Sequence, residues 1–368
     1  MELKKTSLYS FHISQKAKMV EFAGWEMPIQ YQSIIEEHLA VRNHVGMFDV
    51  SHMGEIRIQG KDVIQFLEQL TPNFVADQKI GQIRYSVILN PEGGVKDDVT
   101  MFRENQYSFF LIVNAANTQK IYDYLRNEKK EHQVEIQNLS EEISMIALQG
   151  PKAEEIAVEV FPTQKNYIKE LQYYHFIDVE YSNSTLRIAR TGYTGEDGFE
   201  FLSEHSVILE LWETFFKKGV IPCGLGARDS LRLEAVYPLY GNELDEEKTP
   251  IESGIGWVVK EKEISYYGKE KLLLQKKSNP EKMVIPFLMS DFAIPRKGNL
   301  VFDPTSGLEI GVVLSGSYSP ILKKGIGTAF LPFLYKEPEK EIHIEIRGKK
   351  QRAYTIKPPF VKGSVKKK

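Results

Sequence analysis

The pattern of apolar residues changes near residue 280, and this change constrains the fold more than any other feature of the chain. Beyond it, apolar residues stop recurring at helical spacing and form short extended runs separated by turns. Such runs without intervening helices are typical of small barrels. We therefore expect residues 281–368 to form a separate C-terminal β-barrel, with strands that include Met283–Met289, Ile310–Ser315, Gly327–Leu331 and Ile342–Ile346.

Residues 1–280 mix helical and extended segments without a strict strand–helix alternation, which predicts an α+β fold. Ser33 and Glu36 form a capping box, so a helix is expected from about Ser33 to His44. Helical spacing of apolar residues predicts two more helices, at 63–70 and 208–215. No glycine-rich fingerprint follows a strand and opens a helix, which argues against a dinucleotide fold or a phosphate loop. The expected strands are Glu55–Gln59, Ser108–Val113, Val134–Asn138 and Ile143–Gln149, and Val179–Arg190 is expected to be an extended run folded about Ser182-Asn183-Ser184.

The composition is that of an ordinary globular protein, with 368 residues of which 42% are hydrophobic and 26% charged. A formal net charge of −3 gives no basic field that would attract nucleic acid. The single cysteine, Cys223, excludes an internal disulfide, and the histidines lack a paired spacing, so we expect no metal site. The N-terminus lacks an apolar signal core, and no run approaches the roughly 18 apolar residues that cross a membrane. We therefore expect a cytoplasmic protein without membrane association.

Residues 90–100, with the sequence NPEGGVKDDVT, predict a turn between two strands. Asp97 and Asp98 stand at the first residues of the second strand. Because successive side chains of a strand point to opposite faces, at most one of the two should face the interior. Aspartate is also common in solvated turns. The segment alone is therefore compatible with one buried acid or with two solvated acids.

Residues 190–200, with the sequence RTGYTGEDGFE, hold three glycines and four charged residues directly after an extended run. Glycine permits close backbone approaches, Tyr193 can stack on a flat ring, and Glu200 can accept paired N–H donors. The segment therefore suits a loop shaped around the edge of a pteridine or purine. A wide hairpin with solvated acids remains the alternative.

Two arginines, Arg228 and Arg232, lie four residues apart on one face of a helix predicted to follow Gly224. Guanidinium groups bind carboxylates bidentately. The pair can therefore clamp a substrate carboxylate, or it can hold acids such as Asp229 and Glu234 in a structural network.

Residues 48–53, with the sequence FDVSHM, alternate apolar and polar side chains, as a half-buried strand does. We expect His52 and Met53 to pack in the interior. Cys223 has no histidine within a few residues to activate it, which argues against a catalytic thiol.

Taken in order, eight segments resemble motifs of the T-protein family, the aminomethyltransferases of the glycine cleavage system. The resemblance covers nearly the whole chain, and eight motifs in the right order make it specific. The segments are FAGWEMP at 22–28, GMFDVSHM at 46–53, GGVKDD at 93–98, RTGYTGEDGFE at 190–200, GLGARDSLRLEA at 224–235, LYGNE at 239–243, GIGW at 254–257 and SGSYSP at 315–320.

The resemblance implies a three-domain, cloverleaf-like fold around a tetrahydrofolate channel, with a small β-barrel as the C-terminal domain. Residues 1–280 would then hold two α+β subdomains that are discontinuous in sequence. The implied reaction transfers the methylene of an aminomethyl group on dihydrolipoyl H-protein to tetrahydrofolate. Its products are 5,10-methylene-tetrahydrofolate, ammonia and dihydrolipoyl H-protein, and no metal is required.

The resemblance also implies roles for single residues. Asp98 matches the key acid near folate N10, where its carboxylate would orient N10, take up its proton and stabilise an iminium-like carbon. Arg232 would reach the negatively charged end of the bound folate, and Arg296 matches an arginine near the entrance of the lipoyl arm. The remaining folate-contacting candidates are Met53, Tyr85, Asn114, Tyr193, Glu200 and Tyr240.

The chain departs from the family pattern at two places. Gly298-Asn299-Leu300 stands where the family usually has glycine, tyrosine and an apolar residue, which weakens the carrier-docking inference. Lys96 replaces an apolar residue beside the acidic pair, and its charge would favour the ionised form of Asp98 if the two side chains point the same way.

Two other functions stay open at this point. One is a folate-binding protein of the same fold without transferase activity, like the iron–sulfur-assembly relatives, although those carry a cysteine-containing loop signature and Cys223 lies elsewhere. The other is a folate-dependent demethylase module, which is normally fused to a flavin domain.

Overall fold

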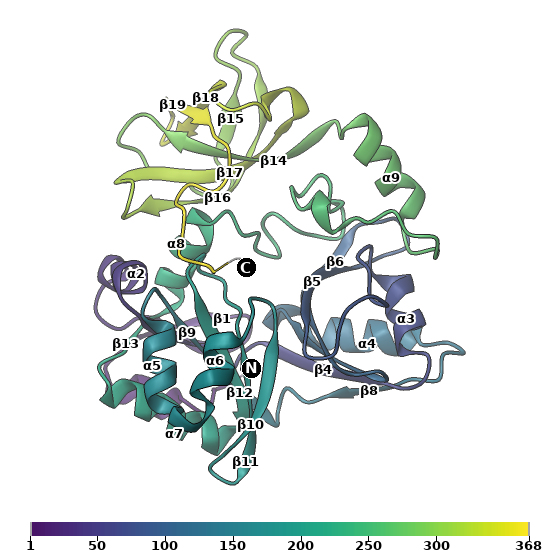
Figure 1. The fold of residues 1–368 in the computed structure, drawn as a ribbon. Helices are drawn as coiled ribbons and strands as arrows, with labels where there is room; N and C mark the ends of the chain where they lie inside the picture. The colour runs from purple at the N-terminus through teal and green to yellow at the C-terminus, as the bar shows by residue number, and fades with distance from the viewer. Residues whose placement is uncertain (1, 367–368) are drawn as a thin grey trace.

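Three lobes, each built on its own sheet, make up the protein in the computed structural model, which describes residues 2–366 (Figure 1). The first two lobes combine helices with sheets, and the third is a closed barrel. This arrangement confirms the α+β, three-lobed fold with a C-terminal barrel that the sequence predicts. Within the described residues, no helix is long and apolar enough to cross a membrane.

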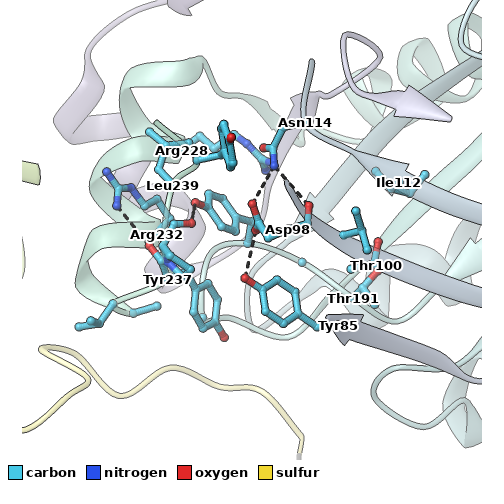
Figure 2. Close-up of a pocket in the computed structure, with 18 of the residues that line it drawn as sticks. Tyr85, Asp98, Thr100, Ile112, Asn114, Thr191, Arg228, Arg232, Tyr237 and Leu239 are labelled. Atoms are coloured by element: carbon cyan, nitrogen blue, oxygen red, sulfur yellow. Dashed lines mark hydrogen bonds between the residues drawn. The ribbon is translucent and has the colours of Figure 1, made fainter. Parts of the chain in front are cut away.

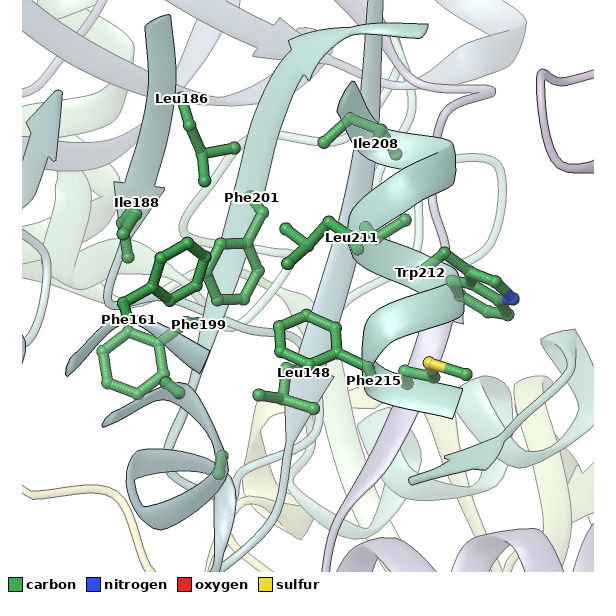
Figure 3. Packing of buried hydrophobic residues seen from close by; sticks show 14 of the residues in the cluster. Leu148, Phe161, Leu186, Ile188, Phe199, Phe201, Ile208, Leu211, Trp212 and Phe215 are labelled. Carbon is green, nitrogen blue, oxygen red and sulfur yellow. The ribbon is translucent and has the colours of Figure 1, made fainter. Parts of the chain in front are cut away.

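The first lobe is a six-stranded sheet in the order β10-β11-β12-β9-β3-β13. Helix α7 packs its apolar face on strands β9 and β12, where Leu211, Trp212 and Phe215 meet Leu148 and Phe201 (Figure 3). The strands are β3 (Gly46–Asp49), β9 (Ile143–Gln149), β10 (Phe176–Tyr181), β11 (Ser184–Ala189), β12 (Gly198–Glu204) and β13 (Ile221–Pro222), and the helices are α5 (Ala153–Val160), α6 (Lys165–Glu170) and α7 (His205–Lys217).

The second lobe is a five-stranded antiparallel sheet in the order β5-β6-β7-β4-β8, inserted between strands β3 and β9 of the first. Its buried core, which includes Ile56, Phe66 and Leu111, lies between the sheet and two helices. The elements are β4 (Gly54–Gln59), β5 (Ile83–Leu89), β6 (Val95–Asn105), β7 (Ser108–Val113) and β8 (Glu135–Asn138), with α3 (Val63–Leu70) and α4 (Thr118–Glu128).

The third lobe is a six-stranded barrel in the order β14-β17-β16-β15-β18-β19, closed by the pairing of β14 with β19. Phe287, Val313 and Ile342 are fully buried inside it. The strands are β14 (Lys282–Met289), β15 (Leu300–Phe302), β16 (Glu309–Ser319), β17 (Lys324–Pro332), β18 (Glu341–Ile346) and β19 (Lys349–Thr355). The four strands expected from the sequence are all present. The division into independent domains at residue 280 stays a prediction.

Further elements join the lobes. Helix α8 (Leu225–Glu234) packs against α2 (Ile34–Asn43) on one side and against barrel strand β16 on the other. The Ser33 hydroxyl caps α2 by accepting from the Glu36 amide at 3.4 Å, as the capping box predicts. The other elements are α1 (Tyr9–Ser14), β1 (Lys18–Phe22), β2 (Trp25–Gln30) and α9 (Lys269–Ser278).

After β19 the chain runs back onto the first lobe, where it lies near the centre of the molecule (Figure 1). The Phe360 amide donates to the Glu234 carbonyl at 3.0 Å, and the Ser364 amide donates to Glu196 Oε2 at 2.9 Å. The C-terminal segment thus ties the barrel to helix α8 and to the loop before β12.

One element differs from the sequence prediction. Residues 48–53 do not form a half-buried strand, because β3 ends at Asp49 and lies between β9 and β13 with every residue buried. The buried Asp49 of this run accepts from Thr6 at 2.6 Å and is paired with His12 at 2.9 Å.

Candidate active site

A large cavity of about 1970 Å³ lies where the lobes meet. Its walls include Met53 and Thr191 from the first lobe and its loops, Thr100 and Ile112 from the second, and Phe360 from the C-terminal segment. Pockets for single small ligands usually measure about 300–1,000 Å³. This cavity therefore has room for an extended ligand together with part of a second one.

Asp98 faces this cavity from strand β6 (Figure 2). The Tyr85 hydroxyl, on the paired strand β5, donates to Asp98 Oδ2 at 3.1 Å, and the Asn114 amide donates to Oδ1 at 2.8 Å. Burial raises the pKa of Asp98 to about 6, although these two donors act in the opposite direction. A carboxyl with such a pKa can exchange a proton near neutral pH.

Lys96 has partners other than Asp98. The Lys96 ammonium forms an ion pair with Glu246 Oε2 at 2.9 Å and lies over the Tyr124 ring, 4.6 Å from its centre. The condition for the expected effect, a Lys96 ammonium directed at Asp98, is therefore not met, and the pKa of Asp98 is set mainly by burial.

Asp97 points to the opposite face of β6, as the strand alternation predicts, but it is not solvated. Its side chain is fully buried and does not line the cavity. It accepts from the main-chain amide of Asn114 at 2.9 Å, from the Asn114 carboxamide at 2.8 Å and from Asn117 at 2.6 Å. The expectation that only one of the two acids is enclosed is therefore wrong, because the start of helix α4 covers the second face.

Glu200 lies in the cavity wall on strand β12, and only 9% of its surface is exposed. The Thr191 hydroxyl donates to its Oε2. Burial raises its pKa, and the charge of Arg228 partly offsets this effect. The start of strand β12, directly after the loop of residues 190–197, thus brings an acid to the cavity.

Tyr193, in the same loop, also lines the cavity. Its hydroxyl donates to the Pro238 carbonyl, which fixes the ring in place. The ring is therefore a preformed flat surface in the wall, beside the guanidinium of Arg228 at 4.8 Å from its centre.

The two arginines of helix α8 have different environments. Arg232 is 1% exposed and donates to Asp229 at 2.9 Å, to Glu243 at 3.2 Å and to Ser315 of the barrel at 2.8 Å. Arg232 is thus held in the structural network that the sequence left as an alternative, although part of it borders the cavity.

Arg228 lines the same cavity, and its guanidinium has no hydrogen-bond partner among residues 2–366. Burial lowers its pKa, and the charge of Glu200 acts in the opposite direction. A guanidinium without a hydrogen-bond partner in a cavity wall can bind an anionic or carbonyl group of a ligand. The sequence placed this arginine in the right helix but could not show which of the two faces the cavity.

Two further residues of the wall were not predicted as site residues. His52 is 3% exposed, its Nδ1 atom has no partner in the described part of the chain, and burial lowers its pKa to about 4. Trp257 is 57% exposed and stacks on Tyr85 with 5.6 Å between the ring centres. Both border the cavity, and their spacing in the sequence gave no sign of it.

The structure brings most of the predicted site residues into this one cavity. Tyr240 lines it and accepts from Lys120 at 2.9 Å. Arg296 does not line it: the side chain is exposed and donates to the Gly316 carbonyl at 3.0 Å. The predicted residues that do line the cavity are Met53, Tyr85, Asp98, Asn114, Tyr193, Glu200, Arg232 and Tyr240.

Comparison with known proteins identifies the class of protein to which this fold belongs. The profile of the GCVT N-terminal domain matches residues 8–263, and that of the glycine cleavage T-protein C-terminal barrel domain matches residues 282–362. A crystal structure of glycine cleavage system aminomethyltransferase T from Bartonella henselae superposes with a TM-score of 0.92 at 33% identity, and covers 99% of this chain and 100% of that one. The fold is thus that of a GCVT-type transferase.

Curated relatives are similar over their whole length. An aminomethyltransferase of Leptospira interrogans is 44% identical over 99% of both chains, and one of Thermoanaerobacter pseudethanolicus is 42% identical over 99% of both. The chain belongs to the glycine cleavage T-protein family of aminomethyltransferases.

Proposed function

We propose that this aminomethyltransferase uses tetrahydrofolate as the acceptor and a lipoylated H-protein as the donor, with Asp98 as the catalytic acid–base group. The observation that carries the proposal is the position of Asp98. Its carboxyl faces the cavity, Tyr85 and Asn114 fix both of its oxygens, and its pKa of about 6 lets it exchange protons near neutral pH.

The other groups in the cavity wall suit the parts of a folate. The pterin ring carries N–H donors, and Glu200 supplies a buried carboxylate to accept them. Aromatic rings stack on flat surfaces, which Tyr193 and the pair of Tyr85 and Trp257 provide. Arg228 has a guanidinium without a hydrogen-bond partner in the described chain, available for a carbonyl or carboxylate oxygen, so we assign to it the folate-contacting role that the family resemblance implies for Arg232.

The transfer breaks two bonds of one carbon and forms two others. The aminomethyl carbon loses its bonds to nitrogen and to the lipoyl sulfur, and it gains bonds to N5 and N10 of tetrahydrofolate. The two N–H protons released by the folate leave with ammonia and with the thiol. Ionised Asp98 would orient N10, accept its proton and stabilise the cationic carbon before the second bond forms.

The lipoyl arm would enter beside Arg296. The neighbouring Lys297 donates to Asn242 Oδ1 at 2.8 Å, and Asn242 lines the cavity. The loop that carries Arg296 therefore lies at the rim, where an extended arm could pass from a docked carrier to Asp98.

The deciding experiment measures methylene-tetrahydrofolate and ammonia formed from an aminomethylated lipoyl carrier, with and without the protein. We expect both products to form faster with the protein and only when tetrahydrofolate is present. No gain in rate would overturn the proposal, and tight folate binding without turnover would favour the folate-binding scaffold in its place.

A further inference from the structure

Asp97 and Asp98 are joined by a single side chain, that of Asn114. A carboxamide nitrogen carries two hydrogens. The Asn114 nitrogen is 2.8 Å from Asp97 Oδ1 and 2.8 Å from Asp98 Oδ1, so each hydrogen is directed at one of the two carboxyl groups. One planar group thus sets the distance and the relative orientation of both acids.

Asp97 determines which end of the Asn114 amide faces Asp98. An ionised carboxylate only accepts hydrogen bonds, so the amide must present its nitrogen, and not its oxygen, to the space between the acids. The Asn114 main-chain amide and Asn117 also donate to Asp97, at 2.9 and 2.6 Å, and hold its carboxylate in place. If the amide turned over, its oxygen would face Asp98 and repel the ionised form.

Burying a carboxylate is costly unless hydrogen bonds compensate for it. Asp97 is fully buried and lies outside the cavity, so it cannot touch a ligand bound there. Its three donors include two from Asn114, the residue that also holds Asp98. The arrangement therefore gives the buried acid an effect on the cavity through one intermediate side chain.

We propose that Asp97 is a positioning residue for the transfer reaction, which fixes Asn114 and through it the carboxyl of Asp98. This inference rests on the proposed role of Asp98 as the catalytic group. It adds a second carboxylate that acts without contacting either substrate.

The charges of the two acids support this role. Burial and the facing charge of Asp98 raise the pKa of Asp97, and burial raises that of Asp98, so the pair takes up one proton more readily than a lone carboxyl does. The N–H donors of Asn114 and Asn117 act in the opposite direction on Asp97 and favour its ionised form. The other titratable groups near the pair are Glu243, Tyr85, Tyr174, Tyr193 and Tyr240.

The test compares Asp97→Asn with Glu55→Gln, which changes another fully buried acid of the same sheet that neither lines the cavity nor bonds to Asn114. For Asp97→Asn we expect kcat to fall about tenfold to a hundredfold, the usual cost of losing a supporting hydrogen bond at a site. We also expect the acid limb of the kcat profile to move up, because Asn114 then holds less firmly the hydrogen bond that favours the ionised form of Asp98. Glu55→Gln should stay within about threefold of the parent, with its acid limb unmoved.

A double-mutant cycle checks the path of the effect. If Asp97 acts through Asn114, Asp97→Asn should cost much less in an Asn114→Ala background than in the parent. Equal costs in both backgrounds would overturn the proposal. It would also be overturned if Asp97→Asn and Glu55→Gln lowered kcat alike, in proportion to their loss of thermal stability, with no movement of the acid limb.

Failure of the inference can be told apart from failure of the proposed function. If the parent protein forms no methylene-tetrahydrofolate, the proposed function fails and the inference falls with it. If the parent is active and Asp98→Asn is inactive, while Asp97→Asn behaves as Glu55→Gln does, only the positioning role is wrong.

Discussion

The two arginines of helix α8 have different roles, although they are neighbours on one face of the helix. Arg228 and Arg232 are one helical turn apart. Arg232 donates hydrogen bonds to Asp229, Glu243 and Ser315, while Arg228 faces the cavity without a hydrogen-bond partner among the described residues. Helical spacing shows that two residues share a face, but two of the three groups that accept hydrogen bonds from Arg232, Glu243 and Ser315, come from a distant loop and from the barrel.

This difference predicts opposite outcomes for the same substitution. Arg228→Met should weaken tetrahydrofolate binding at least about tenfold with little change in thermal stability, because it removes a ligand-facing cation. Arg232→Met should lower the unfolding free energy by about 3–5 kcal/mol, since it leaves Glu243 buried without its partner. Calorimetric titration and thermal denaturation separate the two, and a loss of stability in Arg228→Met would contradict the assignment.

The raised pKa of Asp98 predicts the pH dependence of turnover. Because the carboxyl must be ionised to accept a proton, activity should be full above its pKa and fall as the pH decreases through about 6. An ordinary aspartate would keep its activity down to about pH 4. The measurement is kcat at saturating substrates between pH 5 and 9, and an acid limb near pH 4 would contradict a buried Asp98.

At the scale of elements, the β5–β6 hairpin places the acid. Its turn brings Gly94 against the loop of residues 245–248, where an added Cβ would lie 1.8 Å from the Glu246 carbonyl oxygen. Gly94→Ala should therefore push the hairpin away, with a loss of about 1–3 kcal/mol in stability and a lower turnover. Glu92→Ala, in the exposed part of the same turn, is the matched control. Equal stability of the two variants in chemical denaturation would contradict this packing.

Local pattern was enough to predict most elements. Apolar spacing gave α3 and α7, the capping box gave α2, and the hairpin at 90–100 is present as β5 and β6. Strand alternation also put Asp97 and Asp98 on opposite faces. It could not show that helix α4 covers Asp97 or that β3 is buried on both sides, because these depend on elements distant in sequence. His52 and Trp257 were missed for the same reason.

At the scale of the whole molecule, the C-terminal segment completes the cavity. It returns from the barrel to the first lobe, where Ser364 bonds to Glu196, and Phe360 lines the cavity. The wall of the site therefore includes residues of the C-terminal segment as well as residues of the first two lobes. The segment that follows the barrel connects the barrel to the site.

A close contact in this segment makes its role testable. A Cβ added to Gly363 would lie 1.9 Å from the Gly195 carbonyl oxygen, so Gly363→Ala should displace the segment from the loop of residues 190–197. We expect folate affinity to fall about three- to tenfold with the barrel intact. Lys366→Ala, which removes an exposed ion pair with Glu154, is the control. Unchanged folate affinity in Gly363→Ala would show that the segment does not shape the site.

The most direct test of the account is the effect of Asp98→Asn on turnover and on folate binding, measured on the same preparation. We predict that turnover falls at least about a hundredfold while the Kd for tetrahydrofolate stays within about tenfold, because the substitution removes a positioned acid–base group but keeps its shape. Asp123→Asn, an exposed acid on helix α4, should change neither quantity. Turnover of Asp98→Asn within about threefold of the parent would contradict the central role of this carboxyl.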